Sequence, residues 1–236
     1  MATITKRLSF ENLLPYASMG KDTDGDGVVD GWTKVTDANA SASWLFDDTE
    51  KAQVINVTAA TGTAVPAVET TDFISVVADT QYTFSAYIKA EGNLVAGASG
   101  TGPQIEIAWY DSSQVFLSSD VAGVFTDTDL TRQSITATAP SNAAYAKVRI
   151  VFRCNDSSAY GTVWGKWAQF QEGTTATDYE ETDFFEIINP AGDANDGYTY
   201  GWEKTSAKKY DGVYAYKTVA SGQYPAIAFR FRTPPN

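Results

Sequence analysis

Histidine is absent from this sequence of 236 residues, and cysteine occurs only once, as Cys154. Without histidine the chain lacks the usual general base, the commonest metal ligand and every Ser-His or Cys-His nucleophile pair. We therefore expect a protein that is not an enzyme, although carboxylates alone serve glycosidases. A single cysteine excludes an intrachain disulfide. Its place at the end of a mostly apolar strand candidate, 148–154, predicts a buried thiol.

Long apolar runs and an excess of basic residues are also missing. No stretch approaches the ~18 apolar residues that a spanning helix needs, so we expect no membrane span. The 17 Lys and Arg against 29 Asp and Glu give a net charge of −12, which argues against a nucleic-acid partner. Residues 1–7 show no secretory signal. The composition is nevertheless typical of secreted proteins, so we expect a virion-surface or extracellular location. Release by lysis and a signal removed beforehand explain this combination equally well.

Short alternating runs between turn residues make up most of the chain. In the segment 82–89, Tyr82, Phe84, Ala86 and Ile88 share one face, and similar alternation occurs at 104–110 and 145–153. At least seven strand candidates lie between residues 50 and 171, which suffices for two packed sheets. The sequence predicts an all-β protein, a jelly-roll-like β-sandwich over residues 1–180 with a smaller C-terminal β segment over residues 187–236. Trp109 alternates with apolar neighbours and is predicted to be a core residue.

An aspartate-rich loop follows the N-terminal segment. Alternate aspartates in a turn place carboxylates around one point, Gly27 permits the tight turn, and hard oxygen ligands at this spacing suit Ca²⁺. Thr33 stands where an EF-hand needs glutamate, so the loop resembles those of thrombospondin type 3 and dockerin-like repeats. A plain Asp/Gly turn is the alternative. The predicted ligands of a structural Ca²⁺ are Asp22, Asp24, Asp26, the Val28 carbonyl and Asp30.

Several motifs together resemble the jelly-roll carbohydrate-binding modules that accompany xylanases and glucanases. They are NLLP at 12–15, DGW at 30–32, YTFSAYIKA at 82–90, WYDSS at 109–113, APSNA at 139–143 and VRI at 148–150. WAQFQEGTTATDY at 167–179 is similar to the segment that closes such domains in phage tail and minor structural proteins. The resemblance implies a virion-surface attachment protein of a phage tail or head appendage. The alternative is a sugar-binding module of a secreted carbohydrate-active protein.

Aromatic side chains are the candidate glycan-binding groups. Tyr87 lies on the polar face of its predicted strand, and Trp164 and Trp167 are expected on opposite faces of theirs. Packing between sheets or subunits is the alternative role for each of them. The partners we expect are other copies of the chain or other virion proteins, with a cell-surface glycan as a further candidate. Nothing in the spacing of Glu69, Glu106, Asp111 and Asp120 marks a glycosidase pair.

The charge is divided unevenly along the chain. Residues 1–197 hold 27 acidic and 11 basic residues, whereas residues 198–236 hold 2 and 6. The segment 187–236 is predicted to be a partial second β unit or an assembly tail. We expect it to pack on the acidic body of another subunit or of the same chain, while an uneven spread by chance explains the charges equally well.

Overall fold

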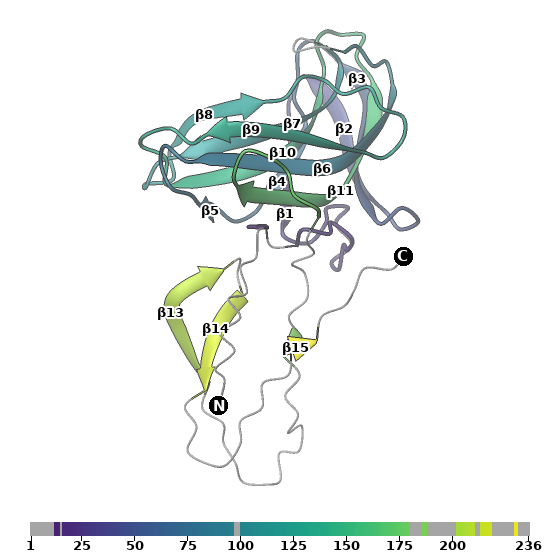
Figure 1. The fold of residues 1–236 in the computed structure, drawn as a ribbon. Helices are drawn as coiled ribbons and strands as arrows, with labels where there is room; N and C mark the ends of the chain where they lie inside the picture. Colours follow the sequence, from purple (N-terminus) through teal and green to yellow (C-terminus); the bar gives the residue numbers. More distant parts are fainter. Residues whose placement is uncertain are drawn as a thin grey trace.

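The main body of the protein is a sandwich of two antiparallel β-sheets (Figure 1). The computed structural model describes residues 12–14, 16–96 and 100–179 in full, and the backbone of four strands at 186–187, 202–210, 213–218 and 229–230. All of the regular structure in these ranges is strand. The predicted all-β sandwich is therefore confirmed. In the same ranges no helix is long and apolar enough to cross a membrane.

Six strands form the first sheet, in the order β1-β4-β10-β7-β8 with β5 beside β10. They are β1 (Trp32–Val35), β4 (Ala67–Thr70), β5 (Ile74–Ser75), β7 (Gly102–Tyr110), β8 (Phe116–Val121) and β10 (Tyr145–Arg153). Five strands form the second sheet, in the order β2-β3-β11-β6-β9. They are β2 (Ala40–Asp47), β3 (Ala52–Ala60), β6 (Gln81–Gly92), β9 (Thr131–Thr138) and β11 (Gly161–Glu172).

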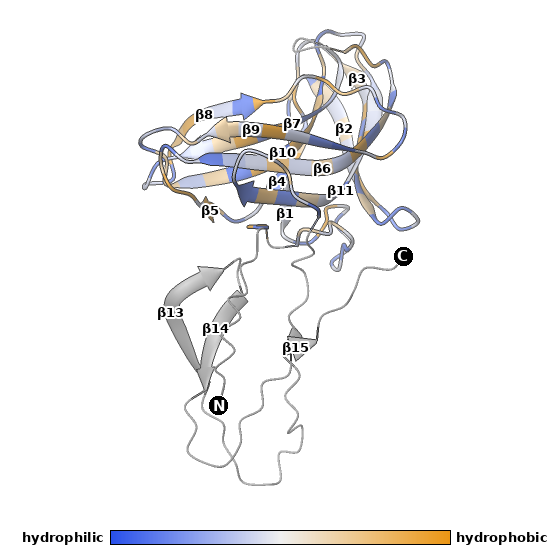
Figure 2. Ribbon diagram, viewed as in Figure 1, coloured by the Kyte–Doolittle hydropathy of each residue, from blue (hydrophilic) through white to orange (hydrophobic). Residues whose placement is uncertain are grey.

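The core lies between the inner faces of the two sheets, where alternate residues of each strand meet. In β6 the residues Tyr82, Phe84, Ala86 and Ile88 are all buried, as the alternation predicts. Tyr82 stacks on Phe170 of β11, with ring centroids 5.2 Å apart and planes 18° from parallel. Figure 2 shows hydrophobic and hydrophilic residues alternating along the strands, so each sheet has one apolar and one mostly polar face.

Two single-residue predictions about the core are confirmed. Trp109 and Cys154 are both fully buried, and burial raises the pKa of the Cys154 thiol to about 11. The indole N–H of Trp109 donates to Asp120 at 2.7 Å, which satisfies the polar atom of a buried ring.

The C-terminal part contributes two pairs of strands. β12 (Glu186–Ile187) pairs with β15 (Phe229–Arg230), and β13 (Trp202–Tyr210) pairs with β14 (Val213–Thr218). The side chains of these strands and the segments between them lie outside the described residues. The division at residues 180 and 187, and the packing of 187–236 on the acidic body, therefore stay predictions.

Candidate functional site

The outer face of the five-stranded sheet carries the three aromatic residues that the sequence marks as candidate sugar-binding groups. The rings of Tyr87 and Trp167 meet edge to face, with centroids 5.2 Å apart. Trp164 lies across from Lys89, and Tyr87 lies across from Lys166. Since Ile88 points into the core, Tyr87 and Lys89 must point outward on either side of it. The three aromatic side chains therefore belong to one surface.

A β-bulge brings Trp167 onto this surface. The pairing of β11 with β6 shifts register between Lys166 and Gln169, and Trp167 has a backbone φ of +51°. Strict alternation places Trp164 and Trp167 on opposite faces, and that prediction is wrong because the bulge inserts extra residues into the strand. A left-handed conformation at a bulky residue costs on the order of 1–3 kcal/mol and persists only where its surroundings hold it.

The N-terminal segment holds the bulge in place. Trp167 donates its backbone N–H to Ser18 and Ala168 donates its own to Ala17, at 3.1 and 2.8 Å. These hydrogen bonds extend the sheet beside the part of β11 that β3 does not reach. The Trp167 side chain is left 40% exposed, although Tyr179 lies 6.1 Å from it and the Lys166 ammonium lies 4.5 Å above it.

Trp164 is fixed by contacts on two sides. Its indole N–H donates to Asp47 at 3.1 Å, and the Lys89 ammonium lies 4.8 Å from the centre of its ring. Backbone N–H donation from Glu50, together with the Trp164 bond, holds the pKa of Asp47 below its usual value. The carboxylate therefore stays ionised as an acceptor, and the ring has a defined orientation on the open face.

Glu50 joins two of the cations on this surface. Lys89 approaches its carboxylate at 3.2 Å, and Lys166 approaches it at 3.7 Å while also donating to the Glu50 carbonyl at 2.9 Å. Both lysines therefore have a counter-charge within the protein. Sequence alternation places Lys89 beside Tyr87, but nothing in the sequence indicates that Glu50 reaches it, because Glu50 lies in the turn between β2 and β3.

Residues 173–179, which follow β11, cover one end of the same outer face. Thr83 donates to the Gly173 carbonyl at 2.9 Å, and Thr136 donates to the Thr174 carbonyl at 3.2 Å. Gln169 and Gln171 are buried beneath this segment and both contact Thr177. Residues 173–179 thus close one end of the sheet, and Tyr179 at the end of this segment lies beside Trp167.

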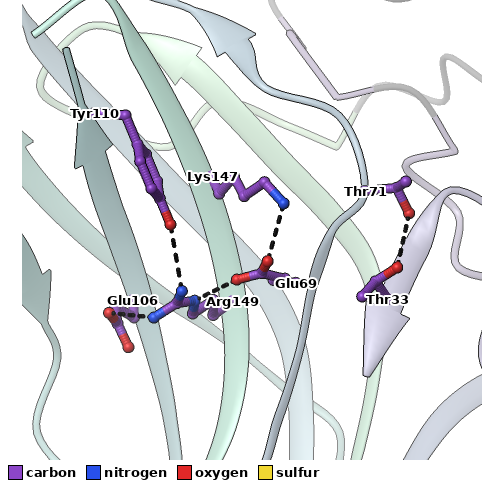
Figure 3. Close-up of polar contacts among 7 residues, drawn as sticks. All are labelled: Thr33, Glu69, Thr71, Glu106, Tyr110, Lys147 and Arg149. Carbon is purple, nitrogen blue, oxygen red and sulfur yellow. Dashed lines mark hydrogen bonds and ion pairs between the residues drawn. The ribbon is translucent and has the colours of Figure 1, made fainter. Parts of the chain in front are cut away.

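The outer face of the six-stranded sheet has a different character (Figure 3). Glu69 on β4 accepts from Lys147 at 2.9 Å and from Arg149 at 2.7 Å, and Arg149 also donates to Glu106 at 3.1 Å. The Tyr110 hydroxyl completes the cluster, 3.4 Å from Arg149. Burial works against the charged guanidinium, but the two carboxylates raise the pKa of Arg149 above its usual value.

The aspartate-rich loop brings three of its predicted metal ligands together. Carboxylate oxygens of Asp22, Asp24 and Asp26 all lie within 4.8 Å of one another. Ca²⁺ binds oxygen at about 2.3–2.6 Å, so ligands on opposite sides of the ion lie about 5 Å apart. Three hard carboxylates at this separation fit such an ion. Each of them also accepts a backbone N–H within the loop, which holds the carboxylates in place.

Asp30 lies outside the cluster of three carboxylates, and its Oδ1 accepts from both the backbone and the hydroxyl of Thr23, at 3.0 and 2.9 Å. The ligand roles of Asp30 and of the Val28 carbonyl stay predictions. Val28 buries its side chain in the core and donates its N–H to Asp26 at 2.8 Å. Both residues line the same pocket as Asp24 and Asp26.

Gln53, which the sequence does not single out, ties this loop to the five-stranded sheet. Its buried amide accepts from the N–H of Val29 at 2.9 Å and donates to the carbonyls of Gly27 and Leu45 at 3.0 and 3.1 Å. Gly27 itself has a φ of +85°, and a Cβ there would lie 2.3 Å from the Trp44 carbonyl. The loop is therefore part of the folded body.

Comparison with known proteins identifies no sequence family and finds distant structural likenesses. No family model and no curated protein matches the sequence. A solved structure of bacteriophage CBA120 tailspike protein 4 matches 69% of this chain and 22% of its own, at 12% identity and a TM-score of 0.47. A family 16 carbohydrate-binding module matches 60% of this chain and 90% of its own, at 15% identity and a TM-score of 0.36. TmCBM61, solved with beta-1,4-galactotriose, matches 70% of this chain and 100% of its own, at 10% identity and a TM-score of 0.41. The likeness is to the β-sandwich of carbohydrate-binding modules.

Proposed function

We propose that this chain is a sugar-binding module and that a carbohydrate lies on the outer face of the five-stranded sheet. The observation that carries the proposal is the gathering of Tyr87, Trp164 and Trp167 on the outer face of one sheet, with Trp167 40% exposed. Pyranose rings stack on aromatic faces, and ligand sites combine such apolar surface with a few fixed polar groups. Asp47, Glu50 and the neighbouring lysines supply those groups here.

A role without catalysis is part of the proposal. On the six-stranded sheet, Glu69 and Glu106 are both committed to Arg149. Asp120 accepts the Trp109 indole N–H, and Asp111 accepts two backbone N–H groups of its own turn. A glycosidase needs two carboxylates free to face the substrate, one as an acid and one as a base or nucleophile. The interactions of these four support binding rather than hydrolysis.

We also propose that the loop carrying Asp22, Asp24 and Asp26 binds Ca²⁺ in a structural role. The support is the fit of the carboxylate cluster to a hard cation and the anchoring of the loop by Gln53. An ion bound here joins the N-terminal segment to β2 and β3. Because that segment also holds the bulge at Trp167, the metal would act on the sugar-binding face through the fold.

Attachment of a virion to host glycans is the second candidate for the biological setting of this binding. The observation that favours it is the segment 167–179, whose sequence resembles the closing segment of phage structural proteins and whose residues 173–179 cover one end of the five-stranded sheet. A module of a secreted carbohydrate-active protein has the same requirement for a glycan. Copurification of the native protein with virus particles, or with a secreted enzyme, distinguishes the two settings.

The test of sugar binding is a glycan array followed by calorimetry on the full-length chain. We expect Trp167→Ala and Trp164→Ala each to weaken binding by roughly tenfold or more, since a stacked ring contributes on the order of 1–2 kcal/mol. Phe116→Ala is the matched control, because Phe116 is an exposed aromatic residue on the edge strand β8 of the other sheet. Equal binding by all three variants, or no glycan bound by the parent chain, overturns the proposal.

A further inference from the structure

Arg132 stands out among the cations of the sugar-binding face by its surroundings. It lies on β9 directly across from Tyr87, and its guanidinium is 6.0 Å from the centre of the Tyr87 ring. One terminal nitrogen, Nη2, donates to the Ser85 hydroxyl at 3.0 Å and to the Gln169 amide oxygen at 3.4 Å. The side chain thus lies along the sheet, at the border between the aromatic surface and the part that residues 173–179 cover.

Arg132 differs from its neighbours on this face in having no acidic partner among the described residues. Lys89 and Lys166 share Glu50, whereas no carboxylate within the described residues lies at ion-pair distance from Arg132. Its two hydrogen-bond acceptors are neutral and occupy Nη2 alone. Nε is buried without a partner, and Nη1 has no acceptor in the described part of the chain.

An ordinary solvated surface arginine does not match these contacts. Such a side chain extends into water and moves among rotamers, whereas Arg132 is half-buried, rests on Tyr87 and is oriented by Ser85 and Gln169. Half-burial removes part of the hydration of the charge, and neutral acceptors replace only part of it. A preoriented guanidinium with spare donors is the usual partner of a carboxylate or another planar or tetrahedral oxyanion.

We propose that the glycan held on this face is acidic and that its anionic group binds Arg132. This inference rests on the proposed sugar-binding function and names the class of ligand, an oligosaccharide that carries a uronate carboxylate or a sulfate. Sugar rings stack on Trp164 and Trp167, and the anion of an adjacent residue meets the guanidinium beside Tyr87. Lys89 and Lys166 share Glu50 and lie against the rings of Trp164 and Trp167, so their charges are partly compensated within the protein.

The experiment compares glycans that share a backbone and differ only in charge. The array contains triplets of neutral, uronate-bearing and sulfated oligosaccharides of equal length, and calorimetry then measures the best triplet with the full-length chain at about 50 and 500 mM salt. We expect an acidic member to bind at least tenfold more tightly than the neutral one, and that advantage to shrink at high salt because mobile ions screen charges. The preferred member identifies the anion as carboxylate or sulfate.

Two arginine variants decide whether Arg132 is responsible. Arg132→Gln should weaken binding of the acidic glycan by roughly 10- to 100-fold, as expected for a charge-assisted hydrogen bond, and leave the neutral glycan within about twofold. Arg153→Gln is the matched control, since Arg153 is a half-buried arginine on the other sheet and also has no acidic partner in the described residues. Arg132→Lys keeps the charge without the planar fork and should be intermediate.

The outcomes separate this inference from the function on which it rests. Neutral glycans that bind as well as acidic ones, or an Arg132→Gln variant with an unchanged preference, overturn the acidic ligand and leave sugar binding in place. No binding to any glycan overturns both. Melting curves of each variant show whether the fold is intact, and binding of the neutral member provides a second check that the aromatic surface is preserved.

Discussion

The outer faces of the two sheets carry similar numbers of charged and aromatic side chains but connect them differently. On the six-stranded sheet, Glu69 and Glu106 neutralise Lys147 and Arg149 in one continuous cluster (Figure 3). On the five-stranded sheet, Lys89 and Lys166 share the carboxylate of Glu50, and Arg132 has no acid among the described residues. One face carries a continuous ion-pair cluster, and the other carries three aromatic rings beside Arg132.

The outer faces of the two sheets therefore differ in how their charged side chains are paired, although both belong to one sandwich. A closed ion-pair cluster with little exposed side-chain area contributes to the rigidity of the sheet and offers few groups to a ligand. On the proposed sugar-binding face, exposed aromatic area and a cation without an acid among the described residues trade stability for contacts with a ligand. Because both faces cover the same core, substitutions on one face can be compared with matched substitutions on the other.

The largest expected change comes from the charge cluster of the six-stranded sheet. Glu69→Gln removes the shared partner of Lys147 and Arg149, whose side chains are largely buried, and we expect it to lower the free energy of unfolding by about 2–4 kcal/mol. Glu50→Gln makes the same chemical change on the other face. Glu50 is 38% exposed, so we expect a loss of about 1 kcal/mol or less. Urea denaturation measures the free energy of unfolding of both variants. Equal decreases for Glu69→Gln and Glu50→Gln contradict the contrast between the faces.

Removal of calcium should have the next largest effect. If the loop binds Ca²⁺ at a free concentration of 100 times its Kd, chelation lowers the free energy of unfolding by about 2.7 kcal/mol, since an ion that binds only the folded state stabilises it. Differential scanning calorimetry with and without chelator measures the change. We expect Asp24→Ala combined with Asp26→Ala to abolish the response to chelator.

A second pair of exposed aspartates controls for the charge that this variant removes. Asp127→Ala combined with Asp129→Ala changes the net charge equally and leaves the loop intact, so its response to chelator should match that of the parent chain. A parent chain whose melting temperature is the same with and without chelator rules out a stabilising ion. Weaker glycan binding after chelation would show that the metal acts on the bulge at Trp167.

The smallest effect concerns the core that both faces share. The pKa of Cys154 is about 11 when folded and near its ordinary value of 9 when unfolded, so the protonated thiol is favoured in the folded state. The stability that it contributes is complete below pH 9 and is lost as the pH rises toward 11. Urea denaturation measures the free energy of unfolding at pH 8 and at pH 10. Its decrease between the two pH values should be smaller for Cys154→Ala than for the parent chain. Identical losses contradict this assignment.

The sequence indicates the strands of the core well because burial and alternation are local properties. The segments 82–89, 104–110 and 145–153 all lie within strands, and the residues expected to be buried in 82–89 are buried. The edge strands β1 and β8, and the short strand β4 between β1 and β10, have weaker alternation and are not among the strand candidates. The segment 73–77, one of the seven strand candidates between residues 50 and 171, forms only β5, two residues that pair with β10.

The sequence by itself determines an all-β chain, an aspartate loop with calcium-like spacing and three aromatic candidates, since composition and spacing express local chemistry. Only the tertiary structure brings Trp167 to Tyr87, because a bulge depends on hydrogen bonds to the distant residues Ala17 and Ser18. It also decides that Lys89 and Lys166 share Glu50, while Arg132 has no acidic partner among the described residues. Ion pairs depend on contacts between segments far apart in the chain, and the periodicity of the sequence does not predict such contacts.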